Sequence, residues 1–418
     1  MKIGIVGGGI SGISAAYHLH GTHDVTLLES SPKIGGHTNT ITVPDNSGEK
    51  FNIDTGFIVF NDRNYPYFSN FLADLKVPMM KTDMSFSYTN PSNSVGYAGT
   101  GPGLFPNMKS LISPIHIKRL WNIYKYSKLL NNQSNALRNS GRSITAILKD
   151  HGCPDDVTNS YFSPIASAIW SCSEKDAKKI PAGAFINFFQ NHGLLSFKGR
   201  PNWFTITNGG QNYLKRFKTF FNGTIHENSE VASVKEDSQG VDVYFQDKSI
   251  MRFDTVIMAT HADISAKIYS ESSDKNLAIL RQYLYSHNAV VLHKDVTYMP
   301  KNKKIWASWN VRSQGQNPEE SSFEVTYNMN RLQRLKSQTN FLVTLNPIEL
   351  PENEMILYST YYRHPILSLD KTANERNFSA LNSQGRVYFC GSYLGYGFHE
   401  DGFASGMKVA NLIKSTSG

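Results

Sequence analysis

A glycine-rich turn between two short apolar runs constrains this chain more than any other feature. The run Ile3–Val6 leads directly into the turn at 7–12, with sequence GGGISG, and helical spacing follows over 13–20. A second apolar run, Val25–Leu28, ends in Glu29. Strand, glycine turn, helix, strand and acid in this order are typical of the βαβ unit that binds dinucleotides. The sequence therefore predicts an α/β fold with a Rossmann-like sheet.

Each part of this turn has an expected role. Gly7 permits the tight turn, Gly9 permits close approach of a pyrophosphate, and Gly12 permits close packing of the helix on the strand. Ser11 and the backbone N–H groups at the helix start are expected to hold phosphates. Glu29 follows Gly7 by 22 residues, where a carboxylate accepts hydrogen bonds from ribose hydroxyls. A purely structural glycine turn would leave Glu29 unexplained.

A second pair of glycines distinguishes between dinucleotides. Gly35 and Gly36 come soon after the acid, and His37 and Thr38 follow them. A nicotinamide cofactor requires no second close approach there, whereas FAD is longer and continues past this loop. Gly56 closes a further turn of the form D-x-G. We therefore expect FAD as the cofactor, with these five residues among its contacts.

These motifs resemble those of the flavin-containing amine oxidase superfamily, which includes monoamine oxidases, protoporphyrinogen oxidase and phytoene desaturases. The matching residues are Gly7, Gly9, Gly12, Glu29, Gly35, Gly36, Thr40, Asp54 and Gly56. One position departs from the family pattern, because His37 stands where the family usually has Arg. Arg gives a pyrophosphate a permanent forked charge, whereas His gives weaker, pH-dependent help.

The resemblance also implies that two later segments return to the cofactor. A valine near the adenine, a strand ending in small residues and the start of the final helix are the family features. The corresponding positions are Val231, Thr260, Gly391, Ser392, Gly402, Phe403 and Ala404. A helix amino terminus aimed at the isoalloxazine would stabilise negative charge on reduced flavin. Ordinary strands and a packing helix are the alternatives.

The rest of the chain is expected to form a discontinuous α+β substrate domain. The predicted FAD-binding segments are 1–70, 205–275 and 383–418, and the predicted substrate segments are 71–204 and 276–382. Strand candidates in the second set favour a mixed or antiparallel sheet at the back of a pocket, and 108–150 is expected to be helical.

Aromatic residues just before the final helix supply the catalytic candidates Tyr393, Tyr396 and His399, with core packing as the alternative. His287, His293 and His364 are acid or base candidates by residue type only. In the resembled superfamily, amine oxidases commonly place a Lys on a substrate-domain strand, near flavin N5. The comparable stretch, 285–291, contains no Lys. This difference favours a desaturase-like or isomerase-like reaction over amine oxidation.

A basic segment raises the question of a membrane. The formal net charge is +8, and the stretch from Met84 to Lys149 contains no Asp or Glu. Within it, 108–142 interleaves basic residues with Leu, Ile, Trp and Tyr, as amphipathic helices on anionic membranes do. A core helix with a solvated basic face is the alternative. No nucleic-acid recognition motif accompanies the charge, so we expect no nucleic-acid partner.

Compartment and metal content follow from what the sequence lacks. Three cysteines cannot form a disulfide framework, and neither paired CxxC spacing nor HExxH indicates a metal site. No run of about 18 apolar residues predicts a transmembrane helix. A cytoplasmic location is expected, with peripheral contact with the inner membrane left open. The sequence does not determine the oligomeric state.

Nearly the whole chain resembles a bacterial branch of predicted FAD/NAD-binding proteins, including the ending GYGFHEDG at 395–402. That branch is often encoded beside cyclopropane-fatty-acid synthase genes, which implies redox chemistry linked to lipids. The expected function is that of an FAD-dependent oxidoreductase, which transfers hydride from a carbon of an acyl-lipid-like substrate to flavin N5. A flavin amine oxidase and a non-catalytic flavoprotein partner of a lipid-modifying enzyme are the alternatives.

Overall fold

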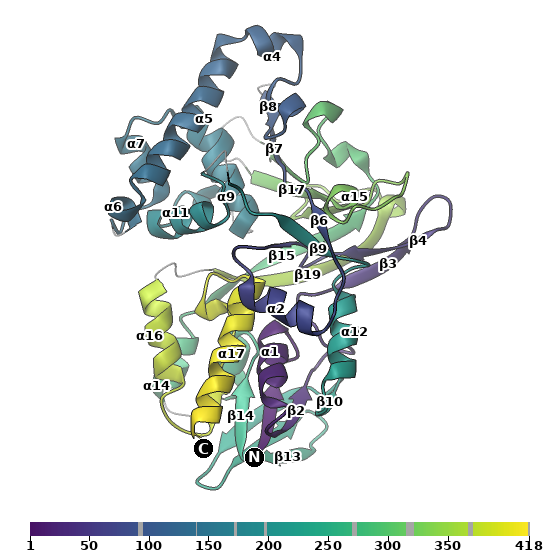
Figure 1. The fold of residues 1–418 in the computed structure, drawn as a ribbon, viewed down its shortest axis with the longest axis vertical. Coiled ribbons are helices and arrows are strands. Elements are labelled where there is room, and N and C mark those ends of the chain that lie inside the picture. Colours follow the sequence, from purple (N-terminus) through teal and green to yellow (C-terminus); the bar gives the residue numbers. More distant parts are fainter. Residues whose placement is uncertain are drawn as a thin grey trace.

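The structure is a computed structural model and describes residues 1–90, 95–138, 140–170, 174–195, 199–269, 274–314, 322–366 and 371–416. The molecule is elongated, with both termini at one end and helices α4 (Met108–Ile112) and α5 (Pro114–Asn132) at the other (Figure 1). Between these ends lies a large mixed sheet.

A parallel sheet gathers strands from the beginning, middle and end of the chain. Its order is β10 (Thr224–His226), β2 (Asp24–Leu28), β1 (Lys2–Val6), β14 (Thr255–Met258) and β20 (Val387–Phe389). In β1, Ile3 and Ile5 belong to the apolar cluster that includes the helices, whereas Val6 belongs to a second cluster on the other side. Burial on both faces explains the continuous apolar runs of these strands.

Two helices from opposite ends of the chain cover one face of this sheet. Helices α1 (Ile10–Leu19) and α17 (His399–Thr416) lie side by side (Figure 1). They approach closely, since a Cβ added at Gly406 would lie 2.1 Å from the Ser11 carbonyl oxygen. The Ser14 hydroxyl donates to the Phe403 carbonyl at 2.6 Å. A three-stranded antiparallel sheet covers the other face and consists of β11 (Val231–Glu236), β12 (Val241–Phe245) and β13 (Ile250–Phe253).

A seven-stranded sheet stands behind the cavity described below. Its order is β19 (Ile356–Ile366), β15 (Leu284–His293), β18 (Leu342–Leu345), β17 (Ser322–Asn328), β16 (Trp309–Gln314), β7 (Phe86–Asn90) and β8 (Val95–Ala98). The pairs are antiparallel except β16 with β7, which is parallel. A mixed or antiparallel sheet was predicted for the substrate segments, and the sheet is mixed. Strands β7, β8 and β16 were not predicted.

Shorter elements connect these layers. The remaining strands are β3 (Thr40–Pro44), β4 (Lys50–Asp54), β5 (Phe60–Asn61), β6 (Met79–Thr82) and β9 (Trp203–Ile206). Helices α3 (Gly101–Leu104), α4, α5, α6 (Ser134–Arg138), α7 (Ile144–Asp150), α8 (Asp155–Val157), α9 (Ser163–Trp170), α10 (Glu174–Ala177) and α11 (Ala182–Asn191) form the helical lobe. The other helices are α2 (Pro66–Asp74), α12 (Gln211–Phe220), α13 (Ala262–Ile268), α14 (Asp274–Leu280), α15 (Met329–Leu332) and α16 (Lys371–Leu381).

The predicted start of the final helix at Gly402 is wrong, because α17 begins at His399. An Asp401 carboxylate oxygen accepts the backbone N–H groups of Tyr396 at 3.1 Å and Phe398 at 2.9 Å, which organises the turn ahead of the helix. Gly402 serves contact between helices, because its Cβ would lie 2.8 Å from Ile10 Cγ2. A glycine inside a helix can thus indicate close packing as well as an end.

The described residues bear on three features considered in the sequence: the cysteines, membrane-spanning helices and metal sites. Cys153 and Cys390 are buried free thiols, and Cys172 lies outside the described residues. Within the described ranges, no helix is both long enough and apolar enough to cross a bilayer. Within the same ranges, no group of three or more His, Cys, Asp or Glu side chains could hold a metal ion.

Candidate active site

A cavity of about 810 Å³ extends from the first glycine turn to the seven-stranded sheet. This volume lies within the range of about 300–1,000 Å³ that is typical of small-molecule sites. Its glycine-rich end is lined by Gly7, Gly9 and Gly36, and its apolar end by residues such as Val343 and Leu345. The two ends differ in chemistry and are described separately.

The glycine-rich end exposes backbone at the start of α1. Gly9 precedes the helix without a side-chain cap, and a Cβ added there would meet nothing within 4 Å. Gly36, in a left-handed conformation with φ of 56°, lies against it, because its Cβ would be 3.1 Å from Gly9 Cα. Two glycine turns therefore leave open space beside the unpaired N–H groups of a helix amino terminus. Such a terminus attracts anions.

Glu29 is held at the edge of this end. Its carboxylate accepts the backbone N–H groups of Gly8 at 2.9 Å and Ser31 at 2.8 Å. The residue is only 8% exposed and lines the cavity. These bonds fix the position of the carboxylate at the end of β2.

The Asp54 carboxylate ties three segments together below the cavity. It accepts from the Thr40 hydroxyl at 2.5 Å, the Gly210 N–H at 2.9 Å and the Gln333 side-chain amide at 3.0 Å. Burial raises the pKa of Asp54 to about 7, although the bonds from Thr40 and Gly210 act in the opposite direction. The acid of the D-x-G turn therefore holds the start of α12, and Gly56 lines the cavity.

Imidazole rings from separate parts of the chain meet in the middle of the cavity wall. The ring of His37 lies 5.6 Å from that of His261 and 5.5 Å from that of His364. Burial lowers the pKa of all three, to about 4 for His261 and about 3 for His364. A His37 ring nitrogen lies 3.2 Å from the Arg363 carbonyl oxygen, which anchors the ring. The cluster is therefore neutral near pH 7.

His399, at the first position of α17, also lines the cavity. Its ring stacks on Phe57 with centroids 3.8 Å apart, and its Nε2 lies 3.3 Å from the Tyr213 hydroxyl. Burial lowers the pKa of His399 to about 3, so this imidazole is also neutral near pH 7. Tyr393 and Tyr396 line the same wall. The hydroxyl of Tyr393 is buried without a hydrogen-bond partner, and burial raises its pKa well above the ordinary value.

The apolar end is built from side chains of the mixed sheet and the helical lobe. Its lining includes Met84, Phe86, Ile165, Ile169, Trp170, Phe188, Trp309, Tyr327, Val343 and Leu345. The carboxylates among the described lining residues are Glu29 and Glu230, which lie toward the end formed by β2 and β11. The one lining residue contributed by β15 is Val290, among the residues that the structure describes.

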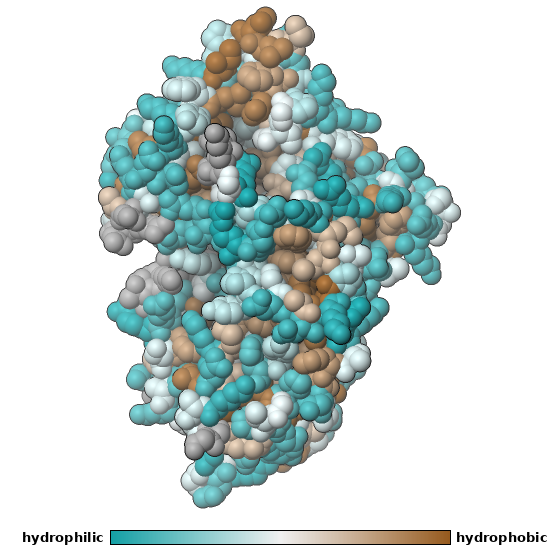
Figure 2. Space-filling model, viewed as in Figure 1, coloured by the Kyte–Doolittle hydropathy of each residue, from teal (hydrophilic) through white to brown (hydrophobic). Residues whose placement is uncertain are grey.

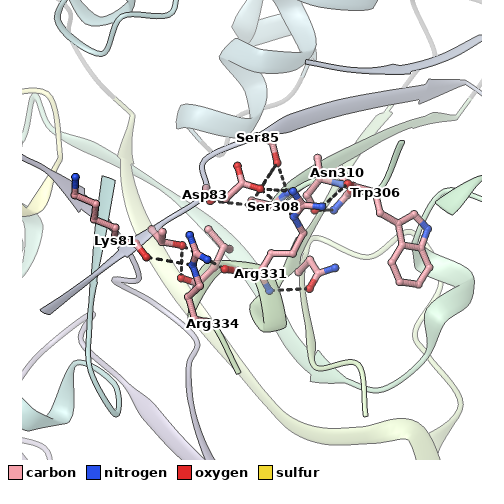
Figure 3. A network of polar contacts seen from close by, with 12 residues as sticks. Lys81, Asp83, Ser85, Trp306, Ser308, Asn310, Arg331 and Arg334 are labelled. Carbon is pink, nitrogen blue, oxygen red and sulfur yellow. Dashed lines mark hydrogen bonds and ion pairs between the residues drawn. The ribbon is translucent and has the colours of Figure 1, made fainter. Parts of the chain in front are cut away.

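A polar network holds one side of this apolar wall (Figure 3). The Arg331 guanidinium binds the Asp83 carboxylate through two nitrogens, and the Ser308 hydroxyl donates to the Asp83 carbonyl at 2.7 Å. These contacts fix the segments that carry Met84 and Trp309, both of which line the cavity. The polar network therefore sets the shape of an apolar surface.

Comparison with known proteins identifies the family. A family model described as flavin containing amine oxidoreductase matches residues 10–343. The chain belongs to this family. The protein is an FAD-dependent oxidoreductase with the amine oxidase type of FAD-binding fold, and the resemblance predicted for the superfamily is confirmed. A search of curated proteins finds no match.

Solved structures share the fold of this flavin oxidoreductase over its full length. Cyclohexylamine oxidase from Brevibacterium oxydans IH-35A is 14% identical, with coverage of 100% of this chain and 99% of that chain and a TM-score of 0.70. A CLA-producing fatty acid isomerase from P. acnes is 12% identical, with coverage of 99% and 98% and a TM-score of 0.69. Putrescine oxidase bound to putrescine is 14% identical, with coverage of 99% of both chains and a TM-score of 0.68.

The residues at the glycine-rich end fit FAD. The open space at Gly9 and the amino terminus of α1 suit a pyrophosphate, and the buried Glu29 carboxylate suits a ribose. The predicted site residues that line the cavity are Gly7, Gly9, Ser11, Glu29, Gly35, Gly36, His37, Gly56, Val231, Thr260, Gly391, Ser392, Tyr393, Tyr396 and His399. Bringing these residues together requires the start, middle and end of the chain.

Five predicted cofactor residues do not line the cavity: Gly12, Thr38, Gly402, Phe403 and Ala404. A Cβ at Gly12 would lie 1.9 Å from the Gly7 carbonyl oxygen, so this glycine allows the helix to pack on the strand. The Thr38 hydroxyl binds the Tyr213 hydroxyl at 2.7 Å. Phe403 is 1% exposed and packs in the core beneath α1. Because α17 starts earlier than predicted, Gly402, Phe403 and Ala404 lie inside the helix and not at its amino terminus.

The histidine cluster and the apolar wall carry no sequence signature. His261 was not a candidate, and His364 was one by residue type only. Of the other two candidates by type, His287 is exposed on β15, and His293 is fully buried with its Nε2 2.7 Å from the Thr344 hydroxyl. His37 follows the second glycine turn, His261 lies between β14 and α13, and His364 lies on β19, so the packing of separate elements brings the cluster together.

Proposed function

We propose that this flavin oxidoreductase acts on an acyl-lipid-like substrate and that hydride passes from a substrate carbon to flavin N5. The observation that supports this most is the apolar end of the cavity, where the described lining residues include no carboxylate and no lysine. An ammonium group would find no counter-ion there, whereas an acyl chain would bury its methylene groups against Trp, Phe, Ile and Val. When bound, FAD would supply the hydride acceptor, with oxygen or another acceptor to reoxidise it.

The chain's own residues would orient the substrate and exclude water. Trp309 and Val343, from the mixed sheet, face the cavity together with Ile169 from α9. Tyr396 and His399 are the proposed contacts at the reacting end, because they line the cavity directly before and at the start of α17. A neutral His399 can exchange a hydrogen bond without adding charge to an apolar site. Tyr393 is a further proposed contact, because it lines the cavity and its buried hydroxyl has no hydrogen-bond partner within the described part of the protein.

Amine oxidation is the second candidate. It is supported by the fold shared with cyclohexylamine oxidase and putrescine oxidase, and by Tyr361 and Tyr362 in the cavity lining. Against it, Val290 is the described residue that faces the cavity from β15, the strand comparable to the one that carries a Lys in superfamily amine oxidases. The fatty acid isomerase from P. acnes shows that the same fold is also found in a protein acting on an acyl chain.

Anaerobic reduction of the bound flavin tests the proposal. The holoenzyme is mixed with an unsaturated fatty acid, a phospholipid or a primary amine, and bleaching of the flavin absorbance is followed. Acyl substrates are expected to bleach it, or to be isomerised without net bleaching, and amines are not. Bleaching by amines alone would favour the second candidate. If nothing reacts, a non-catalytic flavoprotein partner of a lipid-modifying enzyme becomes the better account.

A variant at the apolar end separates substrate binding from cofactor binding. Ile169→Asn places an amide in the apolar wall and is expected to slow reaction with acyl substrates by about tenfold or more, because a buried amide without partners costs about 1–3 kcal/mol. Ile169→Leu, which keeps the volume and the apolar character, is the matched control. Flavin content should be equal in both variants, since Ile169 lies on α9 and away from the glycine turns.

A further inference from the structure

The end of the helical lobe exposes a contiguous apolar surface, which we call the tip patch. Its members are Leu104, Phe105, Met108, Leu111, Ile112, Ile115, Ile117, Trp121 and Tyr124. Four of them are strongly exposed: Ile112 by 77%, Met108 by 75%, Ile115 by 71% and Trp121 by 61%. Hydrophobic residues gather over α4 at this end of the molecule, opposite the termini (Figures 1 and 2). Single exposed apolar residues are ordinary, but a cluster of this kind marks an interaction site.

The amino-terminal part of helix α5 exposes large apolar side chains. The helix buries Ile123, Tyr126 and Leu130 together with His116, Asn122 and Ser127, whereas Ile115, Ile117 and Trp121 are exposed. A surface helix normally turns its apolar side to the core and its polar side to water. Ile115, Ile117 and Trp121 depart from this pattern and are therefore suited to an apolar environment outside the molecule.

The tip patch is held in place by polar contacts. Asn107 caps α4 by accepting the Ser110 N–H at 2.8 Å, and the Ser113 hydroxyl caps α5 by accepting the His116 N–H at 3.3 Å. A His116 ring nitrogen lies 2.7 Å from the Leu104 carbonyl oxygen. These contacts organise the turns beneath the patch, so its exposure belongs to the folded state.

Positive charge surrounds the tip patch from two parts of the chain. The Asn302 side chain donates to the Pro106 carbonyl at 3.1 Å. This hydrogen bond holds the lysine-rich loop at 301–304 beside the segment that leads into α4. The exposed lysines of the two segments are Lys109, Lys118, Lys125, Lys128, Lys301, Lys303 and Lys304. No Asp or Glu occurs between Met84 and Lys149. Helix α5 forms an ion pair between Arg119 and Asp156 at 3.3 Å, and within the described residues none of these lysines takes part in an ion pair.

We propose that the tip patch docks on a membrane surface rich in anionic lipid. The apolar side chains would enter the headgroup region, Trp121 would lie at the interface, and the lysines would contact lipid phosphates. A second copy of the chain is a poorer partner, because a face-to-face pair would bring two sets of lysines together. Docking is independent of the substrate proposed above, although α9 of the same lobe lines the cavity.

Vesicle flotation of the holoenzyme tests this proposal. Binding is expected to phosphatidylcholine vesicles that contain phosphatidylglycerol, to weaken as salt rises, and to be slight with phosphatidylcholine alone. The triple variant Ile112→Ser, Ile115→Ser and Trp121→Ser should lose binding. The double variant Ile250→Ser and Leu350→Ser, which removes exposed apolar residues elsewhere, is the matched control and should bind like the unmodified protein.

A charge variant and a spectroscopic signal complete the test. Lys109→Gln, Lys118→Gln and Lys304→Gln together should weaken binding to anionic vesicles by about 100-fold, from about 1 kcal/mol per lysine. Tryptophan fluorescence should shift to the blue with anionic vesicles, and Trp121→Phe should reduce the shift. The proposal is overturned if neither vesicle type binds, if binding ignores both the lysines and the apolar substitutions, or if sedimentation shows a dimer that the triple variant dissociates.

Discussion

At the glycine-rich end of the cavity, backbone atoms meet backbone atoms, and the residues that meet come from adjacent short motifs. At the apolar end, side chains from α9, β16 and β18 meet, and these elements are far apart in the sequence. The first end depends on the absence of side chains at particular positions, so any added Cβ has a defined consequence. The apolar end depends on the summed volume and polarity of its side chains, so single substitutions can change its shape gradually. Cofactor identity and substrate identity therefore place different demands on the same cavity.

The largest expected effect comes from two glycines three residues apart. Gly12→Val should prevent folding, because the Cβ alone would lie 1.9 Å from the Gly7 carbonyl oxygen. Gly9→Val should instead give a folded protein without FAD, because its Cβ meets no protein atom within 4 Å. Circular dichroism and flavin absorbance of the purified variants distinguish the two results. Full flavin occupancy in Gly9→Val would show that the open space at Gly9 does not receive the cofactor.

Substitution of Phe403 tests whether this residue contributes to core packing or to cofactor binding. Phe403→Ala should lower the free energy of unfolding by about 3–5 kcal/mol, because a fully buried aromatic ring is removed. The folded fraction should keep its flavin, since Phe403 does not line the cavity. Urea unfolding gives the stability, with Phe403→Leu as a milder control. Loss of flavin at unchanged stability would show that Phe403 contributes to cofactor binding, as the sequence predicted.

Glu29 should affect cofactor affinity and also the backbone around it, because both of its carboxylate oxygens accept backbone N–H groups. Glu29→Gln keeps the size of the side chain but removes its charge, so the affinity for FAD should fall by about 1–3 kcal/mol. Titration of apo protein with FAD, followed by flavin fluorescence, measures the change. Glu230→Gln is the control, since Glu230 also lines the cavity but is exposed. An equal loss in both variants would indicate general electrostatics in place of a ribose contact.

The smallest expected effect is the pH dependence of stability that comes from the buried histidines. Burial lowers the pKa of His364 from 6.5 to about 3, so the unfolded chain binds a proton in this window that the folded chain does not. Stability should therefore fall as pH decreases below 6.5. His364→Phe should reduce this loss by on the order of 1 kcal/mol, a value discounted for partial solvent access.

Urea unfolding of the holoenzyme over this pH range measures the effect, and His287→Gln, at an exposed position, controls for removal of a histidine. The Asn288 side-chain amide lies 3.1 Å from His364 Nδ1 and also donates to the Ser286 hydroxyl at 3.0 Å, so it keeps a partner in His364→Phe. An unchanged pH dependence in His364→Phe would mean that this imidazole is not neutral in the folded protein.

The two ends of the cavity also differ in how far the sequence predicts them. Gly7, Gly9 and Glu29 lie within one βαβ unit, and local backbone geometry determines what such a unit does, so the cofactor was predictable. The cluster of His37, His261 and His364 depends on how loops and strands pack across the cavity, which no local pattern encodes. The predicted strands at Ile3–Val6 and Val25–Leu28, which are β1 and β2, are confirmed because continuous apolar runs indicate buried strands. The short strands β7 and β8 lack such a run and were missed.

The start of the last helix shows the limit of a local rule. Glycine favours helix ends in general, but in α17 both glycines lie inside the helix, where α1 requires a close approach. The residues of α1 that impose this requirement are almost 400 positions away in the sequence. Segment boundaries inferred for the two domains remain predictions for the same reason, since they depend on packing between distant segments.

The contact between α1 and α17 has a consequence for biosynthesis. Ser14 and Phe403, which share a hydrogen bond, are separated by 389 positions. A chain leaving the ribosome therefore exposes the apolar side of α1 until translation is almost complete, and β20 joins the sheet equally late. Chaperones that shield the nascent amino-terminal segment would have most of the synthesis time in which to act, and a truncated product would lack the partner that covers its first helix.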